Sequence, residues 1–509
     1  MKILLLEHPR SINPERCNDI ANTPLSSCLL SGYAAGMLQS RGHEVEIVEG
    51  FLDRLAYPEI AERVRAMRPS LLGVHMVYHW ERNSALFHFL EQMKDELGLS
   101  VVAYGFYPTI AFEELLKDCT ALDAVILGEP ETTFAGLAEI IRQKGDPLAL
   151  KGVAARDASG VVRWQPGELV EDLDSLPFPV RTEGLYRIPE VNIQGSRGCY
   201  GKCTFCYINP FYGKGSLWRS RSPENIIAEI DSVIAAKGRK DFYFTDPNFF
   251  GPGRKGQERA LRIASLLKER RLHFGIEGRV NDIHDETIGP LVEAGLRHIL
   301  IGLESGKDDS LQRLNKMTTV AQNENALAVL RRHGIEPNVG FIMFEPESTL
   351  HDVRTNFEFL RRNDLLKNLP ITANVLYHHQ IVLKGTPAYR HLRETGRLRT
   401  ESATAYEGTA AFARPEVAAL AAMMRRITNF LFNRMADIWS GKVIEPVGAR
   451  QRYERVNRLL VGTFEKTLQA LEAGVMPNVA ETDRAAGSTE KEMDEILRGK
   501  EVQPLKCTA

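Results

Sequence analysis

Three cysteines lie close together in the stretch Gly-Cys199-Tyr-Gly-Lys-Cys203-Thr-Phe-Cys206. The spacing C-x₃-C-x₂-C puts three thiols on one short loop. Cysteine thiolates hold iron–sulfur clusters, and a four-iron cluster is ordinarily held by four of them. Three protein ligands leave one iron open to another molecule, so we expect this loop to hold a reactive [4Fe-4S] cluster.

Closely spaced cysteines have two other common uses, a structural zinc site and a disulfide framework. A structural zinc site usually takes four ligands in paired spacing, often with histidine, and no second pair exists in this chain. A disulfide framework is uncharacteristic of a chain with 7 cysteines in 509 residues, which is ordinary intracellular usage. The cluster remains the favoured interpretation.

With Phe205 directly before the last cysteine, the pattern resembles the signature of the radical S-adenosylmethionine (SAM) superfamily. The resemblance implies that Cys199, Cys203 and Cys206 bind the cluster and that its open iron chelates the amino and carboxylate groups of SAM. It implies reductive cleavage of SAM to a 5′-deoxyadenosyl radical, which abstracts a hydrogen atom. The partners it implies are a small-molecule substrate and an external electron donor of flavodoxin or ferredoxin type.

The region that must position the loop alternates apolar strands with amphipathic helices over residues 191–390. We expect strands over 191–194, 241–245, 273–277, 298–303, 337–344 and 372–375. Six strand–helix repeats predict a partial (β/α)₆ barrel, whose sites lie at the carboxyl ends of the strands. The cysteine loop directly follows the first strand, where a barrel would expose it.

Polar and small residues follow the next strands of this barrel. The resemblance implies that Arg279 holds the SAM carboxylate through a bidentate contact. It also implies SAM contacts from the other strand ends, which here carry Asn248, Glu277, Glu304, Ser305, Gly340 and Met343. Asp246 and Glu304, with Glu345 beside them, are acid–base candidates by position.

Residues 1–148 also alternate strands and helices, which predicts a doubly wound, Rossmann-like parallel sheet. Joined to such a barrel, this domain resembles that of the cobalamin-binding subfamily of radical SAM enzymes. The resemblance rests on residues 25–38, 41–49 and 124–131, and it implies that cobalamin is clasped between the two domains. We therefore expect cobalamin as a further cofactor.

Two departures keep an alternative open. There is no D-x-H-x-x-G motif, so no histidine is assigned as a lower cobalt ligand. Tyr104, Phe106 and Tyr107 stand where relatives have small residues that let backbone approach the corrin. If cobalamin binds, the resemblance implies C-methylation of a small metabolite, as in antibiotic or other natural-product biosynthesis. If the aromatics fill its pocket, radical dehydration, epimerisation or cyclisation of a sugar-like substrate is the alternative.

The remaining segments carry less information. Residues 149–190 are expected to form a linker with a hairpin, because prolines 177 and 179 prohibit a helix there. Residues 391–480 have helical periodicity and no strand signal. Residues 481–509 are charged and poor in aromatics, which predicts a disordered tail.

Composition excludes several classes of protein. Hydrophobic residues make up 43% and charged residues 26% of the chain, as in globular proteins. A formal net charge of −2 argues against nucleic-acid binding by bulk charge. No apolar run approaches a membrane span, and the apolar start over residues 3–6 is expected to be a strand. Because the cluster needs a reducing compartment, we expect a cytoplasmic protein; its oligomeric state is not predicted.

Two further classes of function were considered. A tRNA-modifying methylthiotransferase would have three more grouped cysteines, whereas Cys17, Cys28 and Cys119 are scattered. A non-catalytic cluster-binding protein would not need the complete motif on a catalytic loop. For the substrate cavity, the sequence offers aromatic and histidine side chains after the cysteine loop and the sixth strand: Tyr207, Phe211, Tyr212, Trp218, Tyr377, His378 and His379.

Overall fold

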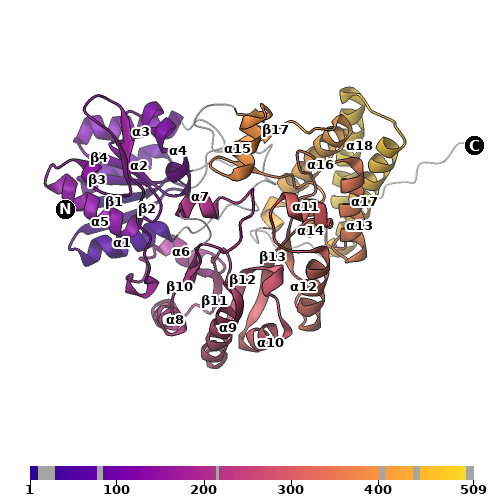
Figure 1. Cartoon of the computed structure of the whole chain (residues 1–509), viewed down its shortest axis with the longest axis horizontal. Helices are drawn as coiled ribbons and strands as arrows, with labels where there is room; N and C mark the ends of the chain where they lie inside the picture. Colours follow the sequence, from indigo (N-terminus) through magenta and orange to yellow (C-terminus); the bar gives the residue numbers. More distant parts are fainter. Residues whose placement is uncertain (10–28, 77–83, 214–216, 401–406, 440–447, 500–509) are drawn as a thin grey trace, which may run out of the picture.

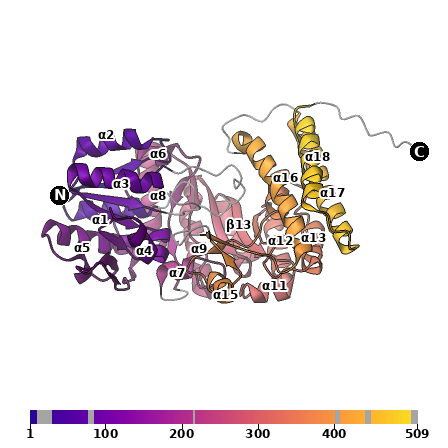
Figure 2. The ribbon, with the colours of Figure 1, turned by 90° about the horizontal axis from the view of Figure 1, so that it is seen from above.

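The computed structural model describes residues 1–9, 29–76, 84–213, 217–400, 407–439 and 448–499. Three parts follow one another along the long axis of the molecule (Figure 1). The N-terminal α/β domain lies at one end, the second α/β unit lies in the middle, and three long helices lie at the other end. The C-terminal helices pack beside α13 (Leu350–Arg362) of the middle unit (Figure 2).

The N-terminal domain is built on a seven-stranded sheet of order β2-β1-β3-β4-β5-β6-β7. Its first five strands are parallel: β1 Lys2–Glu7, β2 Glu44–Glu49, β3 Leu71–His75, β4 Ser100–Tyr104 and β5 Ala124–Ile126. The helices between them are α1 Leu30–Ser40, α2 Tyr57–Met67, α3 Ser84–Leu97, α4 Phe106–Asp118 and α5 Pro130–Arg142. These elements confirm the doubly wound, Rossmann-like fold.

Both faces of this sheet are covered, as the continuous apolar strands require. Helices α1 and α5 pack on one face around Phe134, and α2, α3 and α4 pack on the other around Leu90. The expected hairpin is present as β6 Val153–Arg156 and β7 Val162–Trp164, and β6 pairs antiparallel with β5. The hairpin therefore extends the N-terminal sheet.

The middle unit has a five-stranded parallel sheet of order β14-β13-β12-β11-β8. Its strands are β8 Val191–Ile193, β11 Asp241–Phe244, β12 His273–Arg279, β13 Leu296–Glu304 and β14 Asn338–Phe341. The helices of this unit are α6 Glu183–Arg187, α7 Ile208–Tyr212, α8 Pro223–Lys237, α9 Gly253–Leu267, α10 Asp285–Ala294, α11 Asp308–Arg313, α12 Val320–Arg332 and α13 Leu350–Arg362. This arrangement confirms the partial barrel as the class of fold.

The sixth strand expected over residues 372–375 is wrong. Those residues lie in helix α14 Leu369–Val375, which begins with Pro370 in its first turn, where a fixed φ suits a helix. A short apolar run does not distinguish a buried strand from a buried helix. The chain rejoins the sheet edge only at a single parallel bridge between Phe344 and His379.

The C-terminal part contains strands where only helices were expected. Short strands are present after residue 390: β16 Leu398–Arg399 and β17 Glu407–Ala410 form a small sheet with β15 Val382–Leu383, beside α15 Pro387–Glu394. The long helices are α16 Pro415–Trp439, α17 Ala449–Glu472 and α18 Val479–Leu497. Phe464 of α17 stacks on Phe357 of α13 with ring centroids 5.0 Å apart, so these helices share the barrel core.

The disorder expected from residue 481 is wrong as far as Leu497. Asn478 caps α18 by accepting a hydrogen bond from the backbone of Glu481, whose side chain accepts one in return. Ala486, Met493 and Ile496 are buried on one face, so a sparse apolar stripe is enough to anchor a charged helix. Cys17, Cys28 and residues 500–509 lie outside the described residues. Among the helices that the structure describes, none is long and apolar enough to cross a membrane.

Candidate active site

The cysteine loop leaves the carboxyl end of β8 and is held at both ends. Strand β9 (Ser196–Arg197) pairs antiparallel with β10 (Arg219–Ser220) immediately before the first cysteine. Gly198 has φ of +77°, and a Cβ there would lie 1.9 Å from the carbonyl oxygen of Leu217. Only glycine fits this turn. The backbone of Thr204 bonds to Leu314 and Ala388, which fixes the far end of the loop.

All three thiols on this loop are free and form no disulfide. The sulfur of Cys199 accepts a hydrogen bond from the backbone N–H of Gly201 at 3.3 Å. Burial raises the pKa of the Cys199 and Cys206 thiols, and the nearby sulfur of Cys203 adds to this for both. Metal binding must therefore release protons from these groups.

The donor set fits an iron–sulfur cluster. Cys199 and Cys206 are partly buried against an apolar group that contains Ile208 and Phe211, and such a shell limits the access of water to the metal. In the described part of the chain, no three His, Cys, Asp or Glu side chains are grouped as ligands of a single metal ion.

Arg279, at the end of β12, lies against the cysteine loop. Its Nη1 donates to the sulfur of Cys203 at 3.6 Å, its Nη2 donates to the carbonyl of Lys316, and its Nε donates to Asn281 at 3.3 Å. A Cβ on Gly201 would lie 2.3 Å from Nη1, so the glycine admits the guanidinium. The predicted bidentate contact with SAM remains a prediction.

Asp246 and Asn248 are fully buried at the end of β11. The carboxylate of Asp246 accepts from the backbone N–H of Gly195 at 2.6 Å and from the hydroxyl of Ser196 at 2.8 Å. Burial raises the pKa of Asp246. The side chain of Asn248 donates to Asp282 at 3.0 Å. In this structure Asp246 holds the start of the cysteine loop, and its acid–base role stays a prediction.

The other predicted residues lie at the ends of β12, β13 and β14. Glu304 is 8% exposed, and its Oε1 accepts from Nζ of Lys316 at 2.7 Å. The hydroxyl of Ser305 bonds to the side chain of Asn356 at 2.8 Å. Gly340 is next to Glu304 across the sheet, and Met343 is fully buried. Phe205 is half-buried within the cysteine loop.

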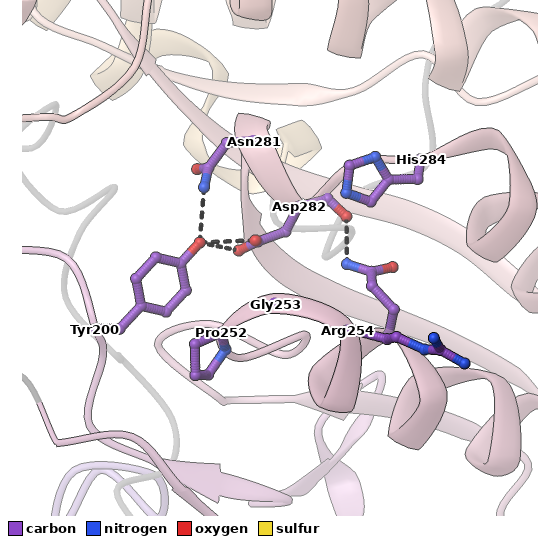
Figure 3. Close-up of a pocket in the computed structure, with 8 residues that line it drawn as sticks. Tyr200, Pro252, Gly253, Arg254, Asn281, Asp282 and His284 are labelled. Atoms are coloured by element: carbon purple, nitrogen blue, oxygen red, sulfur yellow. Dashed lines mark hydrogen bonds between the residues drawn. The ribbon is translucent and has the colours of Figure 1, made fainter.

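A pocket of about 440 Å³ opens beside the cysteine loop. As Figure 3 shows, the hydroxyl of Tyr200 points at the carboxylate of Asp282, to which it donates at 2.6 and 2.7 Å. Asn281 donates to the same hydroxyl at 2.9 Å, and Pro252 and His284 line the rim. Because Tyr200 adjoins Cys199, this pocket borders the cluster position. No motif in the sequence marks this pocket.

The three aromatic residues that could fill the cobalamin pocket, Tyr104, Phe106 and Tyr107, lie in two different places. Tyr104 and Tyr107 are buried in the cores of the N-terminal domain, and the hydroxyl of Tyr104 bonds to Ser31 at 2.7 Å. Phe106 instead points across the domain boundary. Its ring centroid lies 4.2 Å from that of Phe211 and 4.9 Å from that of Tyr207.

This boundary is where the resemblance places cobalamin, and its residues fit a planar ligand only in part. Gly105 and Gly128 both have positive φ at the ends of β4 and β5, so backbone at this edge can lie close to a ligand. A Cβ on Gly128 would meet only the carbonyl of Phe211, at 3.6 Å. The rings of Phe106, Tyr207 and Phe211 are in direct contact, so a corrin between them requires these rings to separate.

A buried ion-pair network joins the N-terminal domain to the cysteine loop. Arg197, two residues before Cys199, donates to Glu129 at 3.0 Å and to Glu131 at 2.7 Å. Arg219 of β10 also donates twice to Glu129, at 2.9 Å. Burial disfavours the charge of Arg197, but Glu131 and Glu129 raise its pKa above the usual value. The sequence gives no local signal for this network, because its members lie far apart in the chain.

The pKa of Glu277 gives a testable pH dependence. Burial raises it to about 7, against the hydrogen bond from Tyr243 at 3.0 Å. A raised carboxyl pKa contributes stability that is full below the unfolded value and is lost as pH rises through the folded value. We expect the parent protein to lose stability relative to Glu277→Gln between about pH 4.5 and pH 7, as measured by urea midpoints. Equal changes in both proteins would contradict the assignment.

Comparisons with known proteins agree with this geometry. Residues 193–360 match the Radical SAM superfamily. The chain is 25% identical over 380 residues to an uncharacterised methyltransferase of Pyrococcus horikoshii, covering 72% of this chain and 79% of that protein. It is 26% identical over 353 residues to the anaerobic magnesium-protoporphyrin IX monomethyl ester cyclase of Rubrivivax gelatinosus, covering 65% of this chain and 61% of that protein.

A solved structure shares the whole fold. It is that of OxsB, a cobalamin-dependent S-adenosylmethionine radical enzyme with aqua-cobalamin and S-adenosylmethionine bound. The match has a TM-score of 0.75 and covers 98% of this chain and 84% of that one, at 19% identity. It therefore includes the N-terminal domain and the C-terminal helices as well as the barrel.

Proposed function

We propose, from the premise that this chain belongs to the radical SAM superfamily, that it functionalises an unactivated carbon of a small molecule through a 5′-deoxyadenosyl radical. The family implies a [4Fe-4S] cluster and SAM. The observation that carries the proposal is the loop with Cys199, Cys203 and Cys206 at the carboxyl end of β8. When bound there, the cluster supplies the electron for reductive cleavage of SAM.

The chain's own residues would prepare this site. Asp246 fixes the entry to the loop, Arg279 sets a positive charge beside Cys203, and Gly201 N–H bonds the sulfur of Cys199. Hydrogen bonds and charge near the sulfurs raise the reduction potential of a cluster. The external electron donor is proposed to be of flavodoxin or ferredoxin type.

The reaction that we propose is cobalamin-dependent C-methylation. Its support is the methyltransferase among the relatives and a fold like that of OxsB over both domains. Gly128 would lie against the corrin, and cobalamin, when bound, would supply the methyl group. The second candidate is a radical dehydration, epimerisation or cyclisation without cobalamin. The ring contact of Phe106 with Tyr207 and Phe211 favours it.

One reconstitution tests the proposal. The protein is loaded anaerobically with iron and sulfide, and then given SAM and dithionite; 5′-deoxyadenosine is measured by mass spectrometry. Formation of 5′-deoxyadenosine with four irons per chain supports the radical SAM function. A full iron complement without that product contradicts it.

Cobalamin binding distinguishes the two reactions. We expect about one cobalt per chain after incubation with hydroxocobalamin and removal of the excess, whereas iron without cobalt would favour the second candidate. We also expect Phe106→Ala to bind cobalamin roughly tenfold more tightly. In this variant, cobalamin would no longer have to separate two aromatic ring contacts, each of which contributes about 0.5–1.5 kcal/mol. Phe112→Ala is the matched control, because Phe112 lies in the same helix and packs on Trp164 within its own domain.

A further inference from the structure

Lys316 joins two of the predicted site residues, although nothing in its sequence context singled it out. It lies between α11 and α12, and only 5% of its surface is exposed. Its Nζ donates to Glu304 at 2.7 Å, and its backbone carbonyl accepts from Arg279. Arg279 in turn donates to the sulfur of Cys203. One residue therefore connects the end of β13 to a cluster ligand.

The backbone around this connection is strained. Glu304, Asn315 and Met317 have φ of +64°, +49° and +58°, a region that non-glycine residues rarely adopt. Such conformations cost on the order of 1–3 kcal/mol each and persist where the surroundings enforce them. The two strained residues that flank Lys316 aim its carbonyl and its side chain at different partners.

The sheet also makes room for the ion pair. A Cβ on Gly302 would lie 2.4 Å from Oε1 of Glu304 and 2.5 Å from Nζ of Lys316. A Cβ on Gly340 would lie 3.7 Å from the other carboxylate oxygen. The pair thus lies against backbone of β13 and β14, where side chains would otherwise stand. Burying such a pair gains little stability over apolar residues, so stability alone does not account for it.

We propose that Lys316 is a positioning residue of the active site, which holds Glu304 with its side chain and Arg279 with its carbonyl. The inference rests on the proposed function, because the groups that it positions are those predicted to face the cluster and SAM. Its ammonium also adds positive charge near Cys203. Two properties should therefore depend on it: the ease of reducing the cluster and the affinity for SAM.

The test compares Lys316→Met with the parent protein after anaerobic reconstitution. We expect a parent-like iron content, a more negative midpoint potential in an EPR-monitored redox titration, and a SAM dissociation constant at least about tenfold higher. One tenfold step corresponds to about 1.4 kcal/mol of binding free energy. Lys307→Met is the matched control, since Lys307 pairs with Asp352 on a neighbouring segment. It should change neither quantity.

A second variant covers the case in which Lys316→Met does not fold with Glu304 left unpaired. Lys316→Met/Glu304→Gln removes both charges, so it should be the more stable protein and still show the weakened SAM binding. Parent-like potential and SAM affinity in either variant overturn the proposal. If the parent itself forms no 5′-deoxyadenosine, the proposed function fails, whereas a parent that turns over beside an unchanged variant removes only the role of Lys316.

Discussion

Replacing Cys203 by alanine is expected to abolish 5′-deoxyadenosine formation while leaving the protein folded. Cys203 is the middle one of the three predicted ligands and the most buried of them, at 8% exposure, and its sulfur accepts from Arg279. With two thiolates left, the cluster loses a corner of its protein support. The backbone of Thr204 keeps its bonds to Leu314 and Ala388, so the loop stays anchored without the Cys203 thiol.

The measurement is iron content and 5′-deoxyadenosine after anaerobic reconstitution with SAM and dithionite. We expect iron to fall well below four per chain and the product to fall below detection, with a melting temperature close to that of the parent. Cys119→Ala is the matched control, because Cys119 is a buried thiol in the core of the N-terminal domain. It should keep its iron and its turnover. Product at the parent rate from Cys203→Ala would refute the ligand assignment.

Much of the fold followed from local patterns. Fully buried parallel strands appear as continuous apolar runs, and β1 was predicted within one residue at each end for that reason. The strand expected over residues 372–375 failed because a run of four residues carries no period. The helix over Val479–Leu497 was missed because its few apolar residues gain their burial from α16 and α17, which are distant in sequence.

The candidate site likewise contains residues that local spacing indicates and residues that only tertiary packing brings together. The three cysteines stand out in the sequence because the ligand role predicted for them depends on spacing within one loop, and that role stays a prediction. Asp246 was named as an acid–base group, yet its carboxylate accepts from Gly195 and Ser196, a contact between two strand ends. Lys316 could have been suspected only from its place shortly after the fourth strand. Contacts of this kind are set by tertiary packing, which spacing does not encode.

Replacing Arg197 by methionine should have the largest effect on stability. Arg197 is 1% exposed, and its removal leaves Glu131, which has no exposed surface, without its cation. Breaking a buried pair by deleting one partner costs about 3–5 kcal/mol, because a charge remains buried and unpaired. We expect a loss of that size in urea unfolding. The reconstituted variant should also take up less iron, since Arg197 anchors the strand that leads into Cys199.

Two further variants distinguish the cost of leaving a buried charge unpaired from the cost of losing the contact itself. Arg262→Met breaks the exposed pair with Glu224 and should cost no more than about 1 kcal/mol. Arg197→Met/Glu131→Gln leaves no unpaired carboxylate at Glu131, so it should recover part of the stability lost by the single variant. Recovery of stability without recovery of iron uptake would mean that the N-terminal domain positions the cysteine loop through Arg197. A single variant as stable as Arg262→Met would mean instead that the two domains meet without this network.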